Sequence, residues 1–165
     1  MDDGRESFTR WARAAQPGLL RLAVLLTGDH HRAEDLVQEA LTKIALRWRR
    51  LRSQSPDAYA RRVLVRDNIS WWRRHRREQV SAVEVRPVAS GEAAVDRRLV
   101  LARALAGLTA GQRSAVVLRF YDDLSERETA AAMGVSLGTV KSQTHLALRR
   151  LREQAPELAE LLETT

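Results

Sequence analysis

The chain contains no cysteine among its 165 residues. That absence excludes disulfides, thiolate zinc sites and thiol-based redox sensing within the chain. The sequence contains four histidines, namely His30, His31, His75 and His145. They do not follow metal-ligand spacing, and the acidic residues cluster at predicted helix starts instead of pairing as a catalytic site would. We therefore expect no metal, no cofactor and no enzymatic activity.

Long apolar runs are also missing. No stretch approaches the roughly 20 residues that a helix needs to cross a bilayer. The first residues, MDDGRESFTRWARA, are polar and lack the apolar core of a signal peptide. The sequence therefore predicts a soluble, cytoplasmic protein without membrane insertion.

Lysine is scarce, although the chain is strongly basic. The net charge is +7 and the pI is about 11.0, yet lysine occurs only at Lys43 and Lys141. This charge predicts an anionic partner, nucleic acid first and an acidic membrane surface second. Arginine suits nucleic acid because its guanidinium binds phosphate through two hydrogen bonds and stacks on bases. A genomic base composition that favours arginine explains the same excess equally well.

The hydrophobic pattern is helical nearly throughout. Apolar residues recur every three or four positions, and no segment alternates convincingly as a strand would. Pro17 and Gly18 are expected to interrupt the first helix, which residues 27–29 (TGD) then end. Ser55 and Pro56 supply a cap and a first-turn proline for the third helix. The sequence thus predicts an all-α fold.

One segment lacks large side chains. Residues 80–95 contain Pro87, Ser90 and Gly91, which favours a flexible linker over a short ordered segment. We expect this linker to join two small helical domains, at 5–79 and 96–163.

Residues 124–152 show local signals for two helices separated by a short turn. Ser125 and Glu128 form a capping box, and Gly134 supplies a left-handed residue that ends the first helix. Ser136 can cap the second helix, whose Val140 faces back toward the first. This pattern resembles the helix-turn-helix motif, whose second helix enters the major groove of DNA.

The second helix of this motif carries a polar face. Donors near its start suit base edges, and arginines further along suit phosphates. The base candidates are Lys141, Ser142, Gln143 and His145, and the phosphate candidates are Arg149 and Arg152. A solvated polar face without a ligand is the alternative interpretation.

The third helix combines arginines with aromatic residues. Basic side chains bind the backbone of melted nucleic acid, while indole rings stack on unpaired bases. The candidates are Arg62, Arg66, Asn68, Trp71, Trp72, Arg73, Arg74 and Arg77. The alternative is that the tryptophans anchor the helix in its own domain and that Asn68 is a cap.

An acidic stretch stands out in this basic chain. Asp35, Leu36, Gln38 and Glu39 belong to the run EDLVQE. Its acids suit a helix start, where they stabilise the helix dipole, and they equally suit a surface that binds a basic partner.

Together these segments resemble a known family. The run AEDLVQEAL, the helix PDAYARRVL to WWRRHRR, the linker and LTAGQRSAVVLRFYDDLSERETAAAMGVSLGTVKSQ follow in the order of bacterial extracytoplasmic-function (ECF) RNA polymerase sigma factors, SigE-type group. The resemblance implies that a first domain, region 2, binds core RNA polymerase through Asp35, Leu36, Gln38 and Glu39. It implies that the arginine and tryptophan helix melts and reads the −10 promoter element. A second domain, region 4, would read the −35 element.

The resemblance has further consequences. Family members are often held by an anti-sigma factor, so such a partner is an expectation beside core polymerase and promoter DNA. Many members carry Asn at the position of Arg66, whereas here Asn68 follows two residues later. The run GVSLGTVKSQ also resembles the output domain of response regulators, so an ordinary DNA-binding activator is the alternative function.

Overall fold

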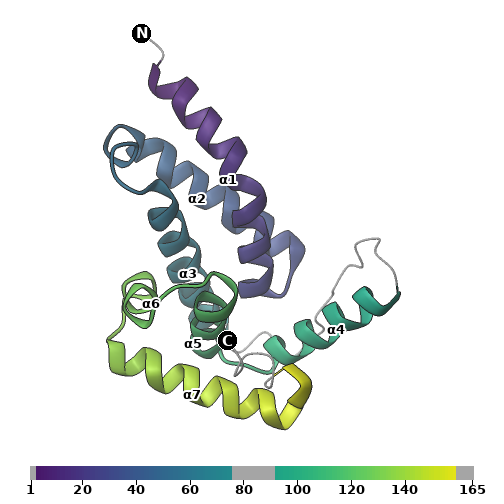
Figure 1. The fold of residues 1–165 in the computed structure, drawn as a ribbon. Coiled ribbons are helices and arrows are strands. Elements are labelled where there is room, and N and C mark those ends of the chain that lie inside the picture. The colour runs from purple at the N-terminus through teal and green to yellow at the C-terminus, as the bar shows by residue number, and fades with distance from the viewer. Residues whose placement is uncertain (1–2, 76–91, 159–165) are drawn as a thin grey trace.

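A computed structural model describes residues 3–75 and 92–158, and every regular element within these two ranges is helical (Figure 1). The elements are α1 (Asp3–Thr27), α2 (His30–Leu51), α3 (Pro56–His75), α4 (Glu92–Ala106), α5 (Ala110–Val116), the π-helical turn η1 (Val117–Tyr121), α6 (Glu126–Met133) and α7 (Leu137–Gln154). The predicted all-α fold is confirmed. Most of the expected linker, residues 80–91, lies outside the described residues, as does Arg77.

Helix α1 is continuous through Pro17, so the predicted interruption at Pro17 and Gly18 was wrong. A proline inside a helix removes one backbone hydrogen bond. Apolar residues on both sides of it nevertheless pack against the same core, with Trp11 before it and Leu19 and Leu22 after it. Tertiary packing of this face outweighs the local loss.

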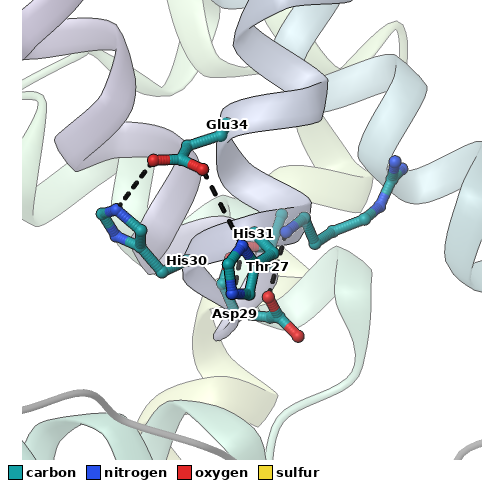
Figure 2. Close-up of polar contacts among 6 residues, drawn as sticks. Thr27, Asp29, His30, His31 and Glu34 are labelled. Atoms are coloured by element: carbon teal, nitrogen blue, oxygen red, sulfur yellow. Dashed lines mark hydrogen bonds and ion pairs between the residues drawn. The ribbon is translucent and has the colours of Figure 1, made fainter.

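The turn between α1 and α2 is held by local hydrogen bonds. Gly28 has a positive φ of 72°, and Asp29 caps α2 by accepting a hydrogen bond of 2.9 Å from the amide of Arg32. Figure 2 shows this cap and the contact between the imidazole ring of His30 and the carboxylate of Glu34. The two groups are 3.1 Å apart. The predicted end of the first helix at residues 27–29 is confirmed, and the turn fixes where α2 begins.

Aromatic residues join the first three helices. The ring of Trp48 on α2 lies 5.4 Å from Phe8 and 5.3 Å from Trp11, both on α1. The indole of Trp11 donates a hydrogen bond of 3.2 Å to Asp57 at the start of α3. An ion pair between Lys43 and Asp67 adds a second link from α2 to α3.

The helices fall into a first group, α1 to α3, and a second group, α4 to α7. Within the second group, α5 begins with another local signal. Thr109 and Gln112 form a capping box at the start of α5, with both hydrogen bonds at 3.2 Å. Helix α5 continues into η1, where the backbone widens by one residue per turn before the chain turns at Asp122. Asp123 then adopts a positive φ of 53°.

The two groups of helices pack against each other. Helix α3 of the first group contacts α6 and α5 of the second group (Figure 1). Helix α1 also contacts α5. Buried residues from both groups form one continuous hydrophobic cluster. Residues that the sequence places in two domains therefore contact each other.

Candidate nucleic-acid and protein interfaces

The helix-turn-helix is built by hydrogen bonds that the sequence predicts. Ser125 accepts a hydrogen bond of 3.1 Å from the amide of Glu128, whose carboxylate accepts one of 2.8 Å from the amide of Ser125. The backbone bond to Ser125, with its side-chain bond, holds the pKa of Glu128 below its usual value. Gly134 ends α6 with a φ of 69°. The predicted capping box and left-handed glycine are confirmed.

Helix α7 buries one face against α5 and α6. Ser136 caps it by accepting a hydrogen bond of 3.1 Å from the amide of Thr139. Val140, Ala147 and Leu151 are buried along its length. This burial fixes which side of α7 faces solvent.

The opposite face of α7 presents donors to solvent. The exposed candidates are Lys141, Ser142, His145, Arg149 and Arg152. Lys141 lies 3.8 Å from Glu126 on α6. Gln143 differs because it is half-buried and packs near Gly111, and its carbonyl oxygen has no hydrogen-bond partner within the described part of the chain. Leu137, an apolar residue that was not among the candidates, is 40% exposed at the start of α7.

The candidates on α3 divide between its surface and the core. Arg62, Arg66, Arg73 and Arg74 are exposed. Asn68 is only 1% exposed, and its side-chain amide donates a hydrogen bond of 3.1 Å to the carbonyl of Leu26. In this arrangement Asn68 supports the fold and is not available to a base.

The two tryptophans at the end of α3 are both partly buried. Trp71 stacks on His75 at 4.4 Å, and the guanidinium of Arg32 lies 4.5 Å from its ring. Trp72 lies edge-on to Trp71 at 5.2 Å, and its indole nitrogen is buried without a hydrogen-bond partner among residues 3–75 and 92–158. Arg113 of α5 covers Trp72 at 5.4 Å.

A cleft of about 850 Å³ opens between the two groups of helices. Its walls include Trp71, Trp72 and Arg73 from α3, Arg32 from α2 and Gln143 from α7. The structure therefore brings candidates for the −10 and −35 elements to one cleft, although the sequence assigns them to separate domains.

Arg113 is a buried cation that sequence reasoning missed. It is 4% exposed and donates to the carbonyls of Leu26 at 3.1 Å, Leu105 at 2.9 Å and Leu108 at 3.5 Å. Burial lowers its pKa to about 10. Nothing in the run GQRS predicts this burial, because arginine is ordinarily a surface residue.

The acidic stretch on α2 forms an exposed surface over a buried anchor. Asp35, Gln38 and Glu39 are exposed, whereas Leu36 is 0% exposed and belongs to the core. Leu46, two turns beyond Glu39, is 81% exposed. Leu36 can thus support this surface from beneath without touching a partner.

Among residues 3–75 and 92–158 no group of His, Asp and Glu side chains is arranged to hold a metal ion. None of the helices described is long and apolar enough to span a bilayer.

Comparison with known proteins places these features in one family. The sequence model for sigma-70 region 2 matches residues 11–78, and that for sigma-70 region 4 matches residues 98–151. The chain is 40% identical to the RNA polymerase sigma-E factor of Streptomyces coelicolor over 89% of this chain and 85% of that protein. It is 34% identical to the ECF RNA polymerase sigma factor SigL of Mycobacterium tuberculosis over 85% of this chain and 84% of that protein.

A solved structure agrees with these sequence matches. The sigma factor RpoE of Bartonella quintana, crystallised in complex with the anti-sigma factor NepR, superposes with a TM-score of 0.72. It is 29% identical, and the match covers 90% of this chain and 96% of that one. The chain therefore belongs to the sigma-70 family, as an ECF RNA polymerase sigma factor that acts in transcription initiation.

Proposed function

We propose that three surfaces of this sigma factor divide the work of promoter selection: the exposed face of α7, the arginine and tryptophan end of α3, and the acidic face of α2. The protein performs no chemistry itself and works in the cytoplasm beside core RNA polymerase. One observation supports this division most directly. Hydrogen-bond donors line the exposed face of α7, the second helix of the helix-turn-helix, and the same chain has a row of arginines on α3.

The face of α7 reads the −35 element. Residues near the start of a recognition helix reach base edges, which gives this role to Lys141, Ser142 and His145, with Gln143 at the rim. Arg149 and Arg152 lie further along the helix and bind phosphates.

The end of α3 melts and reads the −10 element. Its exposed guanidinium groups bind the backbone of the separated strand, and its indoles stack on unpaired bases. The residues in this role are Arg62, Arg66, Trp71, Trp72, Arg73 and Arg74, and we extend the role to Arg77. Asn68 positions the helix from the core through Leu26.

The acidic face of α2 binds core polymerase. Asp35, Gln38 and Glu39 supply exposed carboxylates and an amide for a basic partner surface, while Leu36 holds the helix in place. An anti-sigma factor is a further partner, since the similar Bartonella protein is found in such a complex.

Core polymerase makes the two DNA contacts act together. Each contact alone is small, so the free chain binds DNA weakly. Once both are held on one large partner, the second contact becomes intramolecular and its effective concentration rises.

Run-off transcription with purified core polymerase on a promoter library tests this function. We expect transcripts only when the chain and core are both present, and enrichment of two sequence elements at a fixed spacing. Tight, sequence-specific DNA binding by the free chain that core polymerase leaves unchanged would instead indicate an ordinary DNA-binding activator.

A further inference from the structure

We propose that Leu137 contacts the 5-methyl group of a thymine in the −35 element and so sets part of the promoter preference of this sigma factor. The inference rests on the role proposed above for α7 as the helix that reads this element. It adds an apolar contact to the polar donors named there. The position of Leu137, its exposure and the chemistry of the major groove support it.

Leu137 is the first residue of α7, and the cap before it fixes the first turn of the helix. The hydroxyl of Ser136 accepts a hydrogen bond of 3.1 Å from the amide of Thr139 and lies 2.9 Å from the hydroxyl of the same residue. Residues at the start of a recognition helix are those that reach base edges in the major groove. Leu137 therefore lies where a side chain meets bases.

Leu137 also begins the row of side chains that we assign to bases. Lys141 and His145 follow it at intervals of four residues, so the three lie one after another along the same side of the helix. All three are exposed. A docking geometry that brings Lys141 and His145 to base edges therefore brings Leu137 into the same groove.

The fold does not use Leu137 as a core residue. Val140, Ala147 and Leu151 are at most 1% exposed and belong to the hydrophobic cluster, whereas Leu137 is 40% exposed and is not part of that cluster as it is found in residues 3–75 and 92–158. One exposed leucine is ordinary on a protein surface. At this position, however, contact with DNA would remove apolar surface from water and so add affinity.

The chemistry of leucine narrows what it can read. Its side chain neither donates nor accepts a hydrogen bond, so it binds neither a phosphate nor the polar edge of a base. The 5-methyl group of thymine is the apolar group that base pairs present in the major groove. Gly138, the next residue, leaves room for a close approach, because a Cβ there would meet only the hydroxyl of Ser136, at 3.9 Å, among the described residues.

Replacement of single thymines by deoxyuridine tests this contact, because deoxyuridine lacks only the 5-methyl group and still pairs with adenine. The probes are fluorescein-labelled duplexes that carry both elements returned by the transcription experiment, and the protein is the full chain bound to core polymerase. We expect one substitution in the −35 element, on either strand, to weaken binding by wild type about three- to fivefold, as the loss of one buried methyl group predicts. An element in which no thymine responds would overturn the proposal.

Variants of Leu137 then show whether this side chain makes the contact. Leu137→Ala should bind the unmodified duplex about three- to fivefold more weakly than wild type and should no longer distinguish thymine from deoxyuridine at that position. Leu137→Met keeps an apolar side chain of similar size and should retain the discrimination, whereas the polar Leu137→Asn should lose it. If deoxyuridine weakens binding by Leu137→Ala as much as by wild type, the two changes are independent and the proposal is wrong.

Leu101→Ala is the matched control, since it truncates another exposed leucine, which lies on α4 outside the helix-turn-helix. This variant should respond to deoxyuridine as wild type does. Affinity for core polymerase, measured without DNA, identifies a protein contact instead. A loss of that affinity in Leu137→Ala, with equal losses on the thymine and deoxyuridine duplexes, would place Leu137 against polymerase and overturn the proposal.

Failure of this inference can be told apart from failure of the proposed function. If wild type with core polymerase selects a −35 element whose thymines do not respond to deoxyuridine, the contact by Leu137 is rejected and the role of α7 stands. If it selects no upstream element, the role of α7 is rejected, and the contact by Leu137 is rejected with it.

Discussion

Asn68 on α3 and Arg113 on α5 donate to the same acceptor, the backbone carbonyl oxygen of Leu26, each at 3.1 Å. This carbonyl lies in the last turn of α1, where the helix supplies no partner of its own. The end of α1 thus accepts one hydrogen bond from α3, in its own group of helices, and one from α5, in the group that contains the helix-turn-helix. The shared acceptor couples the local fold of the first three helices to the packing of the second group.

Asn68→Ala should destabilise the protein by about 1–3 kcal/mol, because it leaves a buried carbonyl one donor short. Urea unfolding measures this change. The control is Arg62→Ala, an exposed position on the same helix, which should stay within about 0.5 kcal/mol of wild type and weaken DNA binding instead. Unchanged stability in Asn68→Ala, together with an altered −10 preference, would show that Asn68 reads a base.

Gly134→Ala should cost about 1–2 kcal/mol, because the residue has a φ of 69° that disfavours a side chain. The added Cβ would also lie 3.1 Å from the guanidinium of Arg66. Gly138→Ala is the matched control, since that glycine lies in α7 without a positive φ and has only one neighbour, at 3.9 Å. It should leave stability unchanged or raise it, because alanine favours a helix. Equal thermal midpoints for the two variants would contradict the left-handed cap.

Glu128→Gln should reduce the pH dependence of stability. The backbone and side chain of Ser125 hold the pKa of Glu128 below its ordinary value of 4.5, so the unfolded chain binds the proton more readily. The carboxylate therefore stabilises the fold fully above pH 4.5, and this contribution disappears as the pH falls through the lower, folded-state pKa. Thermal midpoints measured from pH 7 to pH 3 should converge between variant and wild type in acid. Glu153→Gln, which removes an exposed charge near the end of α7, should follow the wild-type curve.

Lys141→Ala and Arg149→Ala should affect DNA binding in two different ways. A residue that contacts bases loses about 1–3 kcal/mol and relaxes the preference at one position, whereas a phosphate contact weakens all sequences equally and lowers the salt slope by about one. Promoter-library binding by the complex with core polymerase, measured at two salt concentrations, separates these patterns. A uniform loss in Lys141→Ala would place that side chain on the backbone.

Glu39→Lys should weaken binding to core polymerase by on the order of tenfold without changing the unfolding midpoint. The substitution reverses a charge on an exposed surface that we propose faces a basic partner, and such reversals act through electrostatic complementarity. Titration of core polymerase into labelled protein measures the affinity. Glu153→Lys makes the same reversal away from α2, so an equal loss in that variant would point to net charge as the cause.

Local signals in the sequence predicted local structure well. The capping box of Ser125, the left-handed Gly134 and the cap at Ser136 all form as expected. Each depends on hydrogen bonds or φ values within four residues, so neighbouring residues suffice to predict it. The order of these motifs along the chain also predicted the family.

Burial of individual polar and apolar residues could not be predicted in the same way. Asn68 and Leu36 were both candidates for contact with a partner, yet both lie in the core. Arg113 was not selected, although it joins the two groups of helices. Whether such a side chain faces a ligand or a neighbouring helix depends on residues far away in the sequence.

The sequence by itself determined the helices, their caps, the helix-turn-helix and the membership in the sigma-70 family, because these follow from short-range hydrogen bonding, hydrophobic periodicity and motif order. Only the tertiary structure decided that α1 passes through Pro17, that Asn68 supports Leu26, and that Arg66 reaches the end of α6. These outcomes depend on packing between segments that are dozens of residues apart. The interactions that stabilise them form only when the helices pack together.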